Sequence, residues 1–503
     1  MEKNVNYVYL CVALVSLLLA ALRKRRRSKD GLLHLPPGPW QLPIIGSLHH
    51  VAWQRQLLPH RAMRDLARRH GPVMLLRIGA VPTVVVSSPD AAREVTRTHD
   101  AAFASRPLTA TFRALTGGGR GIIFAPYGDS WRQLRRLAVT ELLSARRILS
   151  FRAVRAEEVA AMLRDVDVDL RARLSALVAD VTVRAVIGGG LGPGGWNWKE
   201  RDVFLRELDR TIELASAFNP ADLWPSASRA ATRCSASSTV FIKERLERTD
   251  NNGSGGGEAE DLLDVLLKLH KGGGLPSFPL DMDAIKAVIF DIFGAGTETT
   301  TTTIEWAMAE LVRNPRSMQR ATAEVRQAFE PHGAVHEDKL MSEEHRYLRL
   351  VVRETLRLHP PAPLLLPRES REPRRVLGYD VPRGTTVLVN VWALGRDERC
   401  WPRGPEEFRP ERFEAQDEAA GADFKGADFE LLPFGAGRRM CPGMAFGLAT
   451  VELALASLLF HFDWEAPGVP HPAEFDMTES FGITTRRKAG LMLRPVLRVP
   501  LPS

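Results

Sequence analysis

The sequence predicts a mainly α-helical domain with a small β part, preceded by a single transmembrane helix at the amino terminus. Three observations lead to this fold class. Segments with helical apolar periodicity fill most of the chain, two β-rich runs lie near its start, and an uncharged apolar run stands at its amino terminus. A composition of 45% hydrophobic and 25% charged residues is typical of a globular protein with a substantial core.

The amino terminus predicts a membrane anchor. Tyr7–Leu22 is uncharged and mostly apolar, and a basic cluster, Arg23–Arg27, follows it at once. A cleavable signal peptide carries its charge before the apolar stretch, whereas here the charge follows it. Residues 1–30 are therefore expected to anchor the protein and stop its transfer. The positive-inside rule leaves the rest of the chain on the cytosolic side.

The net charge of +8 does not indicate a nucleic-acid partner. Residues 1–30 hold seven basic and two acidic residues, and so contribute five of the eight net charges. The excess is a local patch beside the predicted anchor, with no basic face for nucleic acid elsewhere.

The body is predicted to be one domain, residues 47–503, joined to the anchor by a hinge over residues 31–46. Prolines occupy four of the eight positions from Pro36 to Pro43, which makes this stretch stiff and non-helical. No internal repeat of useful period is found. Gly188–Gly195 and Asn251–Gly257 are expected to be flexible surface connections.

The periodicity also predicts individual elements. Val73–Gly79 and Thr83–Ser88 are expected to form a β-hairpin around a turn at residues 80–82. Five segments have helical periodicity: Glu141–Leu163, Asp281–Leu311, Ser317–Phe329, Tyr347–Leu358 and Ala445–Phe460.

The strongest chemical signal surrounds Cys441. The four cysteines are far apart and lack C-x-x-C spacing, so neither a disulfide framework nor a zinc site is indicated. Glycines enclose Cys441 and can aim backbone N–H groups at the sulfur, and a helix follows it. Both features are expected to favour the thiolate. Arg439 is a candidate partner for a ligand carboxylate. A buried structural cysteine is the alternative.

The spacing F-x-x-G-x-R-x-C-x-G, from Phe434 to Gly443, resembles the haem-binding signature of the cytochrome P-450 family. Other motifs follow in the family's order and resemble its plant group, often called the seventy-one clan. The resemblance implies the cytochrome P-450 fold and haem b (iron protoporphyrin IX) as cofactor. It also makes Cys441 the iron ligand, with Phe434, Arg439 and Gly443 at the haem.

A second motif places Glu354 and Arg357 on one helix face, where their charges can pair. Alone this motif is weak, since E-x-x-R occurs on many solvated helices. By the resemblance, Arg412 joins them in a buried structural network behind the haem.

A third motif, Ala295–Thr300, puts a glycine and a polar cluster inside a long apolar helix. A threonine hydroxyl that bonds back to the carbonyl one turn earlier can open such a helix locally. A solvated threonine-rich stretch is the alternative. The family's acid–alcohol pair corresponds to Glu298, which would deliver protons by general acid catalysis, and Thr299, which would hydrogen-bond the dioxygen.

Further haem contacts are implied by the resemblance. Trp131 and Arg135 lie four residues apart on one helix face and match positions that bond the haem propionates. Arg368 resembles another such residue. A solvated surface charge is the alternative for each arginine.

Substrate contacts implied by the family come from five places: residues 109–124, 209–217, 290–299, 362–366 and 481–484. Their residues are mostly apolar, which favours an apolar ligand held by burial. The pocket residues expected from these segments are Phe124, Ala295, Ala362, Leu366 and Ile483.

The activity expected from the resemblance is monooxygenation of an apolar plant metabolite, a sesqui- or diterpenoid. No G-x-G-x-x-G nucleotide fingerprint is evident, so electrons would come from NADPH through a separate NADPH-cytochrome reductase, with cytochrome b5 as a further donor. The expected location is the endoplasmic reticulum membrane. Two alternatives remain: a haem-thiolate isomerase or dehydratase acting on a hydroperoxide, and a non-catalytic haem-binding protein. Such isomerases usually lack the acid–alcohol pair, and sensing needs no proton relay.

Overall fold

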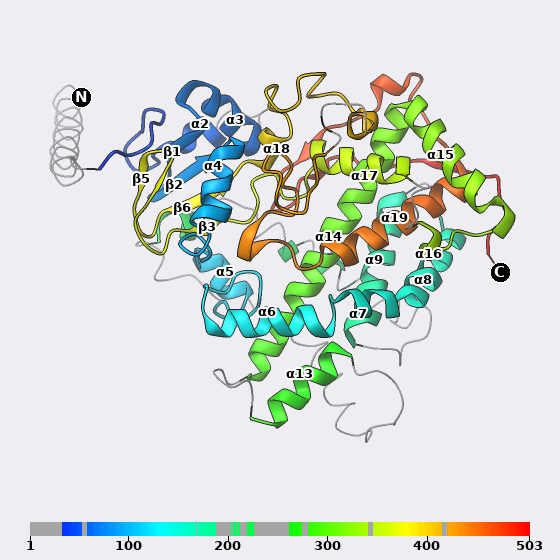
Figure 1. Cartoon of the computed structure of the whole chain (residues 1–503), viewed down its shortest axis with the longest axis horizontal. Helices are drawn as coiled ribbons and strands as arrows, with labels where there is room; N and C mark the ends of the chain where they lie inside the picture. Colours follow the sequence, from blue (N-terminus) through cyan, green and yellow to red (C-terminus); the bar gives the residue numbers. More distant parts are fainter. Residues whose placement is uncertain are drawn as a thin grey trace, which may run out of the picture.

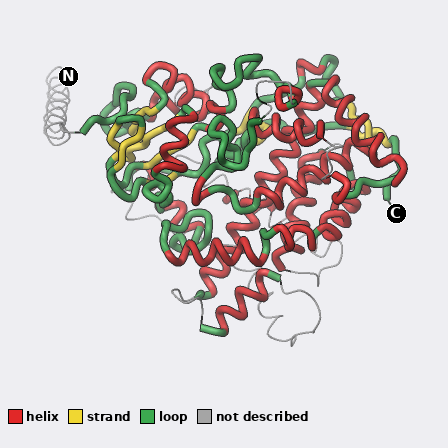
Figure 2. The backbone as a smooth tube through the Cα atoms, viewed as in Figure 1, coloured by secondary structure: helices red, strands yellow, loops and turns green. Residues whose placement is uncertain are grey.

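The computed structural model describes residues 33–52, 58–166, 169–187, 203, 205–208, 210–211, 219–225, 261–273, 280–340, 346–414, 419 and 421–502. Within these ranges the chain forms a broad helical body with a small β region at one side (Figures 1 and 2). The predicted anchor and both predicted surface connections lie outside the described residues.

Helix α14 (Met282–Arg313) runs through the middle of the helical body (Figure 1). Its amino terminus is capped by Asp281, whose carboxylate accepts a hydrogen bond from the N–H of Ala284 at 2.8 Å. Helices α9 (Leu170–Ile187), α17 (Arg346–Leu358) and α19 (Met444–His461) pack against α14 and share its hydrophobic core. Helix α14 is therefore the axis around which the other elements are placed.

The other described α-helices are shorter than α14. They are α2 (Leu48–Ala52), α3 (Pro59–His70), α4 (Pro89–Arg93), α5 (Ala110–Leu115), α6 (Asp129–Glu141), α7 (Ala145–Ser150), α8 (Arg152–Arg164), α11 (Pro220–Leu223), α13 (Leu262–Lys271), α15 (Pro315–Phe329), α16 (Glu337–Leu340) and α18 (Val391–Leu394). Helices α2, α3, α4 and α18 pack in the smaller hydrophobic clusters beside the sheet.

The β region is built on one four-stranded sheet in the order β1-β2-β6-β3. Strands β1 (Val73–Ile78) and β2 (Val81–Val86) form the predicted antiparallel hairpin, and β6 (Thr386–Val389) adds to β2 in parallel. The turn is shorter than predicted, because residues 81 and 82 already belong to β2. Pairing of β2 with β6 begins only at residue 83, so the proline at 82 breaks no bond to β6.

The remaining strands form three two-stranded sheets and the edge of the main sheet. They are β3 (Arg368–Glu369), β4 (Arg374–Val376), β5 (Tyr379–Val381), β7 (Phe462–Glu465), β8 (Glu479–Ser480), β9 (Arg486–Arg487) and β10 (Arg494–Leu497).

Four of the five predicted helices are confirmed within two residues of their expected starts and ends, as α14, α15, α17 and α19. The predicted single helix Glu141–Leu163 is wrong, since the chain there forms the end of α6, then α7 and α8. Ser144 has an extended backbone, and its hydroxyl donates to the carbonyl of Thr140 at 3.1 Å. Such local bonds compete with helix hydrogen bonding, although apolar residues recur at helical spacing on both sides.

The described part of the predicted hinge is non-helical and lies along the sheet edge. The N–H of Leu75 in β1 donates to the carbonyl of Pro37 at 2.8 Å. A Cβ atom at Gly38 would lie 2.0 Å from the carbonyl oxygen of Leu75, so this close approach requires glycine. The segment is held against the body from His34 onward, since the N–H of His34 donates to Asp380 Oδ2 at 2.7 Å and its carbonyl accepts from the N–H of Asp380 at 2.7 Å.

Among the described helices, only α19 is long and apolar enough to cross a membrane. It lies inside the core, where most of its residues are buried, and its apolar composition is explained by packing.

Candidate active site

Cys441 lies in a tight loop, residues 433–443, that leads into α19; we call it the cysteine loop. The N–H of Cys441 donates to the carbonyl of Phe434 at 2.9 Å. Gly437 has φ +67°, and a Cβ atom there would lie 2.1 Å from the carbonyl oxygen of Thr96. Only glycine fits this position. Cys441 is a free cysteine with part of its side chain exposed, so a ligand can reach the sulfur, although the surrounding protein atoms still partly desolvate it.

Groups of the kind expected to favour the Cys441 thiolate are present, and desolvation opposes them. Burial raises the pKa of the Cys441 thiol above its ordinary value, although the N–H of Gly443 and the charge of Arg135 act to lower it. The expected stabilising groups are present, but desolvation of the thiolate outweighs them. A metal ion that binds the sulfur would supply the missing positive charge and deprotonate it.

Four arginine side chains gather beside the cysteine loop: Arg106, Arg135, Arg368 and Arg439. We call them the guanidinium cluster. Burial lowers the pKa of Arg106 well below its ordinary value, and the charges of the other three lower it further. Burial, with the charges of Arg368 and Arg135, also lowers the pKa of Arg439 to about 9. Their positive charges are thus close enough to repel one another.

The positive charge of the guanidinium cluster is only partly balanced. Asp100 Oδ1 lies 3.5 Å from Arg368 Nη1, and the same carboxylate pairs with Arg438 at 3.1 Å. Arg368 Nη1 is buried without a hydrogen-bond partner among the described residues. A buried guanidinium with unpaired N–H groups is costly. A ligand with two carboxylates, such as haem with its two propionates, fits this donor set.

The sequence did not reveal Arg106. Its Nη1 donates to the carbonyls of Leu366 and Pro367 at 2.6 and 2.8 Å, and so ties the residue 362–368 segment to the cluster. The only signal was an arginine in the otherwise uncharged stretch that begins at Ala101 and ends before Arg113.

Trp131 supports the cluster from α6. Its indole N–H, the only donor of the side chain, bonds to the carbonyl of Ile122 at 2.9 Å. The guanidinium carbons of Arg439 and Arg135 lie 4.2 and 5.5 Å from the centroid of its ring. The predicted bond from Trp131 to a propionate would require it to leave Ile122. In this structure Trp131 holds two of the arginines.

Arg135, Arg439 and Phe434 each fix a backbone or ring neighbour. Arg135 Nη2 donates to the carbonyl of Met440 at 2.5 Å, and Arg439 Nε donates to that of Ala104 at 2.6 Å. The Phe434 ring is half-buried and packs edge-on against Phe424, with centroids 5.4 Å apart. These contacts hold the cysteine loop in one position.

The acid and the alcohol on α14 point in different directions. Thr299 Oγ1 donates to the carbonyl of Ala295 at 2.7 Å, which confirms the predicted bond one turn back. The helix remains continuous through these residues, so the predicted local opening is wrong. Glu298 is 5% exposed and accepts hydrogen bonds from Thr484 Oγ1 at 3.1 Å and Arg171 Nη2 at 3.5 Å. Successive helical residues project about 100° apart, which explains the divergence.

Helix α19 brings the cysteine loop to α14. A Cβ atom at Gly447 would lie 3.4 Å from Thr300 Oγ1, so the two helices approach closely at this point. Gly447 stands in the first turns of α19, directly after the cysteine loop, and Thr300 is next to Thr299. The turn of α14 that carries Thr299 and Thr300 therefore lies beside the start of α19, close to the cysteine loop in space.

The structure brings together Glu354, Arg357 and Arg412 as the sequence predicted. Glu354 accepts bonds from Arg357 Nε at 2.7 Å and Nη2 at 2.8 Å, and from Arg412 Nε at 2.9 Å. The three residues are 0%, 1% and 2% exposed. The other arginine donors bond to backbone carbonyls between residues 395 and 407. One carboxylate thus organises two buried charges and the loop below them.

The predicted pocket residues are open to different degrees. Ala295 is exposed although the neighbouring turns of α14 are largely buried, and Phe124, Ala362, Leu366 and Ile483 are half-buried. The Phe124 ring stacks on Phe112 with centroids 4.0 Å apart. Most of the expected contact region at residues 209–217 lies outside the described residues.

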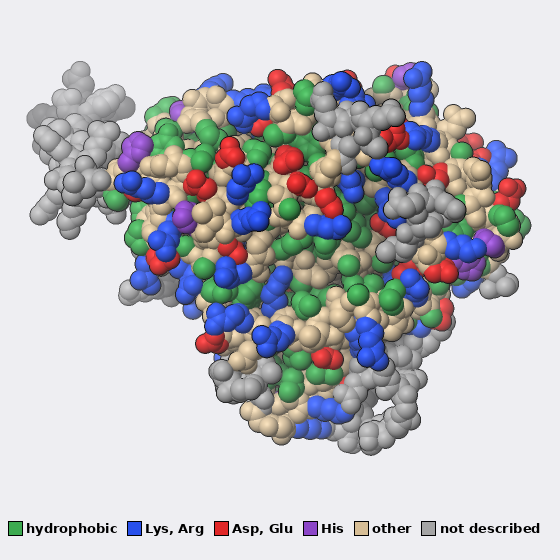
Figure 3. Space-filling view, in the orientation of Figure 1, with side chains coloured by type: hydrophobic (Ala, Val, Ile, Leu, Met, Phe, Trp, Pro, Cys, Tyr) green, Lys and Arg blue, Asp and Glu red, His purple; other side chains and the backbone are tan. Residues whose placement is uncertain are grey.

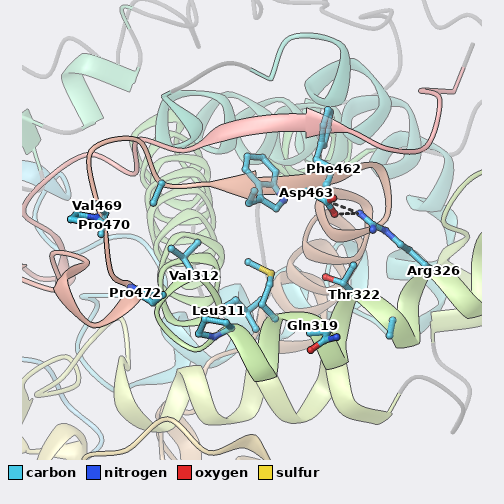
Figure 4. A pocket seen from close by; sticks show the side chains of 15 residues that line it. Leu311, Val312, Gln319, Thr322, Arg326, Phe462, Asp463, Val469, Pro470 and Pro472 are labelled. Carbon is cyan, nitrogen blue, oxygen red and sulfur yellow. Dashed lines mark hydrogen bonds and ion pairs between the residues drawn. The ribbon is translucent and has the colours of Figure 1, made fainter.

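A separate groove of about 630 Å³ lies at the carboxyl end of α14, between α15 and β7 (Figure 4). Arg326 and Asp463 form an ion pair of 2.8 Å at one end of it. Its other lining residues are mostly apolar, and none of the predicted site residues is among them. The groove is therefore distinct from the site around Cys441.

Comparison with known proteins agrees with this geometry. The model of the cytochrome P-450 family matches residues 36–492. Zealexin A1 synthase from Zea mays is 45% identical, covering 97% of this chain and 96% of that protein. Premnaspirodiene oxygenase from Hyoscyamus muticus is 44% identical, covering 94% and 95%. A zebra fish cytochrome P-450 structure with abiraterone has a TM-score of 0.73 and 27% identity, covering 88% of this chain and all of that one.

A thiol on a glycine-rich loop, a cluster of guanidinium groups beside it and a threonine on the facing helix define a haem-thiolate protein. The chain belongs to the cytochrome P-450 family, as its sequence motifs predicted. It is a haem-dependent monooxygenase that acts on an apolar specialised metabolite. The isomerase and the non-catalytic alternatives are not supported.

Glu354→Gln should destabilise the protein by about 3–5 kcal/mol, because it leaves two buried arginines without their counter-charge. Urea unfolding measures the difference. Glu398→Gln, at an exposed carboxylate, is the matched control and should change little. A loss below about 1 kcal/mol for Glu354→Gln would mean that the backbone carbonyls alone satisfy the two guanidinium groups.

Cys441→Ala should abolish both haem retention and the long-wavelength band that a thiolate ligand gives the reduced carbon-monoxide adduct. Absorption spectra of purified protein measure both. Cys400→Ala, at the other described free cysteine, should keep them. A Cys441→Ala variant that kept both the haem and the long-wavelength band would show that another residue binds the iron.

Proposed function

We propose that the protein inserts one oxygen atom from dioxygen into a sesqui- or diterpenoid, with haem b as cofactor and electrons from NADPH through a membrane-bound NADPH-cytochrome reductase. The observation that carries the proposal is full-length similarity to oxygenases named for hydrocarbons of this kind. They are premnaspirodiene oxygenase, at 44% identity, and dolabradiene monooxygenase from Zea mays, also at 44%. The mostly apolar predicted contact segments support the same substrate class.

When bound, haem supplies the redox chemistry by which two electrons and two protons reduce dioxygen to one inserted oxygen atom and one water. The residues of the chain bind the haem and orient the substrate beside it. Cys441 is the residue proposed to hold the iron. The guanidinium cluster is proposed to hold the propionates, with Arg368 Nη1 as a donor free to bond one of them.

Thr299 and Glu298 are proposed to divide the handling of protons. The Thr299 hydroxyl donates to Ala295 and keeps its lone pairs for a second hydrogen bond. The Glu298 carboxylate is 5% exposed, but its partner Arg171 has a side chain that is 19% exposed. Arg171 stays protonated and holds the buried acid near the surface, where water can supply its proton, and a rotation of Glu298 toward Thr299 would complete the relay.

Electron transfer is proposed to use the face that carries α6. Arg132 and Arg136 on this helix are exposed, whereas Arg135 turns inward to the carbonyl of Met440. Arg438 of the cysteine loop is also exposed, with 48% of its side chain in solvent. Figure 3 shows basic side chains over the region where α6 lies in Figure 1. An acidic reductase surface would complement this face.

Attachment to the endoplasmic reticulum membrane, with the body in the cytosol, is proposed to come from the apolar run Tyr7–Leu22. The basic cluster Arg23–Arg27 after it supports this orientation. The one described helix that could span a membrane, α19, is already used in the core.

The direct test expresses the protein with a reductase in microsomes and supplies sesquiterpene and diterpene hydrocarbons. The expected product is heavier by one oxygen atom and requires both NADPH and dioxygen, as read by mass spectrometry. Turnover of a fatty-acid hydroperoxide without NADPH, and of none of the hydrocarbons, would contradict the proposal.

Thr299→Ala should keep haem and substrate binding but lower the product formed per NADPH severalfold, with the difference released as peroxide or water. Product, NADPH and peroxide are measured together. Thr303→Ala, which removes the same kind of bond one turn later on α14, is the control and should stay coupled. Equal coupling in wild type and Thr299→Ala would remove Thr299 from the relay.

Arg132→Glu combined with Arg136→Glu should slow reductase-driven turnover severalfold at low ionic strength, with a smaller effect at high salt. The carbon-monoxide spectrum and peroxide-driven turnover should stay near those of wild type. If both rates fell together, these arginines would be structural, and the reductase would dock elsewhere.

A further inference from the structure

A buried carboxylate on α14 has no part in the chemistry described above. Asp291 lies two helical turns before Thr299 and is 3% exposed. Its Oδ2 accepts hydrogen bonds from the N–H of Ile122 at 2.7 Å and from the N–H of Ile123 at 2.9 Å. Two successive peptide groups of a loop are therefore bound to one oxygen of the central helix.

The chain is built to admit this carboxylate. A Cβ atom at Gly121 would lie 2.1 Å from Asp291 Oδ2 and 3.1 Å from the carbonyl oxygen of Ala287. Any other residue at 121 would push the loop away from α14. Burial raises the pKa of Asp291 to about 7, while the two N–H groups act to lower it. An apolar residue would avoid this desolvation, so the hydrogen bonds are the evident use of the carboxylate.

The same two loop residues are also held from their opposite side. The carbonyl of Ile122 accepts from Trp131 Nε1 at 2.9 Å and from Arg439 Nη1 at 3.4 Å. The carbonyl of Ile123 accepts from Arg106 Nε at 3.3 Å and from Arg439 at 3.4 Å. Residues 122 and 123 thus connect α14 through their N–H groups with the guanidinium cluster through their carbonyls.

Phe124, a predicted pocket residue, follows Ile123 directly in the chain. Its ring stacks on Phe112 of α5 at 4.0 Å. Earlier in the same segment, the N–H of Thr111 donates to Asp222 of α11 at 2.9 Å, and the side-chain amide of Asn219 donates to the Thr111 hydroxyl at 3.0 Å. Those ties are at the outer end of the segment, whereas Asp291 holds its inner end beside Phe124.

We propose that Asp291 is a positioning residue that fixes residues 121–124 between α14 and the guanidinium cluster, and thereby sets which carbon of the substrate faces the oxidising centre. The first part concerns the chain alone. The second part, on the site of oxidation, rests on the proposed function. Without this tie, the loop keeps its bonds to Trp131 and the arginines but is free to move away from α14, and Phe124 moves with it.

The test uses the full-length haem-loaded protein and three variants. Asp291→Leu keeps the approximate side-chain size and removes both carboxylate oxygens, whereas Asp291→Asn keeps one oxygen as acceptor but loses the negative charge that strengthens the two bonds. Asp283→Asn makes the same chemical change on the same helix at a carboxylate whose side chain is 67% exposed. Hydrogen–deuterium exchange of the peptide covering residues 119–125 is measured beside the carbon-monoxide spectrum.

Exchange at the amides of residues 122 and 123 should be at least about tenfold faster in Asp291→Leu than in wild type, because two buried hydrogen bonds are lost. Asp291→Asn should fall between them, and Asp283→Asn should match wild type. The thiolate band should persist in all three. Unchanged exchange in a folded Asp291→Leu protein would overturn the tie. If Asp291→Leu fails to fold, Asp291→Asn decides by the same measurement.

The second readout is the ratio of oxygenated products from one sesquiterpene hydrocarbon that wild type oxidises. The ratio should change in both Asp291 variants and stay constant in Asp283→Asn. Faster exchange with an unchanged product ratio would leave Asp291 as a structural bond and overturn the positioning role. Loss of the thiolate band in both Asp291 variants would do the same. A wild type that oxidises no terpene contradicts the proposed function, while the exchange measurement still tests the tie.

Discussion

The uneven balance of charge beside the cysteine loop constrains the rest of the site. Three buried guanidinium groups and the half-buried one of Arg135 come from four separate segments of the chain, and among the described residues Asp100 supplies the carboxylate that pairs with Arg368. Such a cluster is costly in the protein alone, since each charge is desolvated and each repels the others. The backbone carbonyls around it, including those of Ala104, Met440 and Leu366, reduce that cost and are fixed in return. The guanidinium groups that would bind an anionic ligand therefore also fix the loops that would enclose it.

The sequence predicted those parts of the site whose chemistry depends on local spacing. The cysteine loop and the Glu354–Arg357 pair each lie within about a dozen residues, so their geometry follows from one turn or one helix. Arg106 and Asp291 were not predicted, because each acts on residues far away in sequence. Asp291 bonds to peptides 168 and 169 positions before it. The uncharged stretch around Arg106 marks it as unusual, but it does not report which distant residues it contacts.

Two expectations depended on energy terms that a local motif does not report, and one of them, the single helix Glu141–Leu163, was wrong. The groups that favour the Cys441 thiolate were predicted correctly by kind, but the desolvation that opposes them is a property of the folded core and not of the motif. Apolar periodicity predicted one helix from Glu141 to Leu163, yet the hydroxyl of Ser144 offered the backbone another hydrogen bond. Periodicity records which residues will be buried, and says less about where a helix stops.

The attachment of residues 37 and 38 to strand β1 limits where the body can travel. The first attachment is at His34, which bonds to Asp380, so with the proposed anchor ending at Leu22 about twelve residues join the bilayer to the body, a reach of roughly 40 Å when fully extended. The proposed anchor would confine the catalytic body to a thin layer above the membrane. Apolar substrates dissolve in that membrane, and a reductase anchored in it shares the same layer. Encounters would then depend on the amount of each molecule per unit of membrane area, and dilution of the cytosol would leave them almost unchanged.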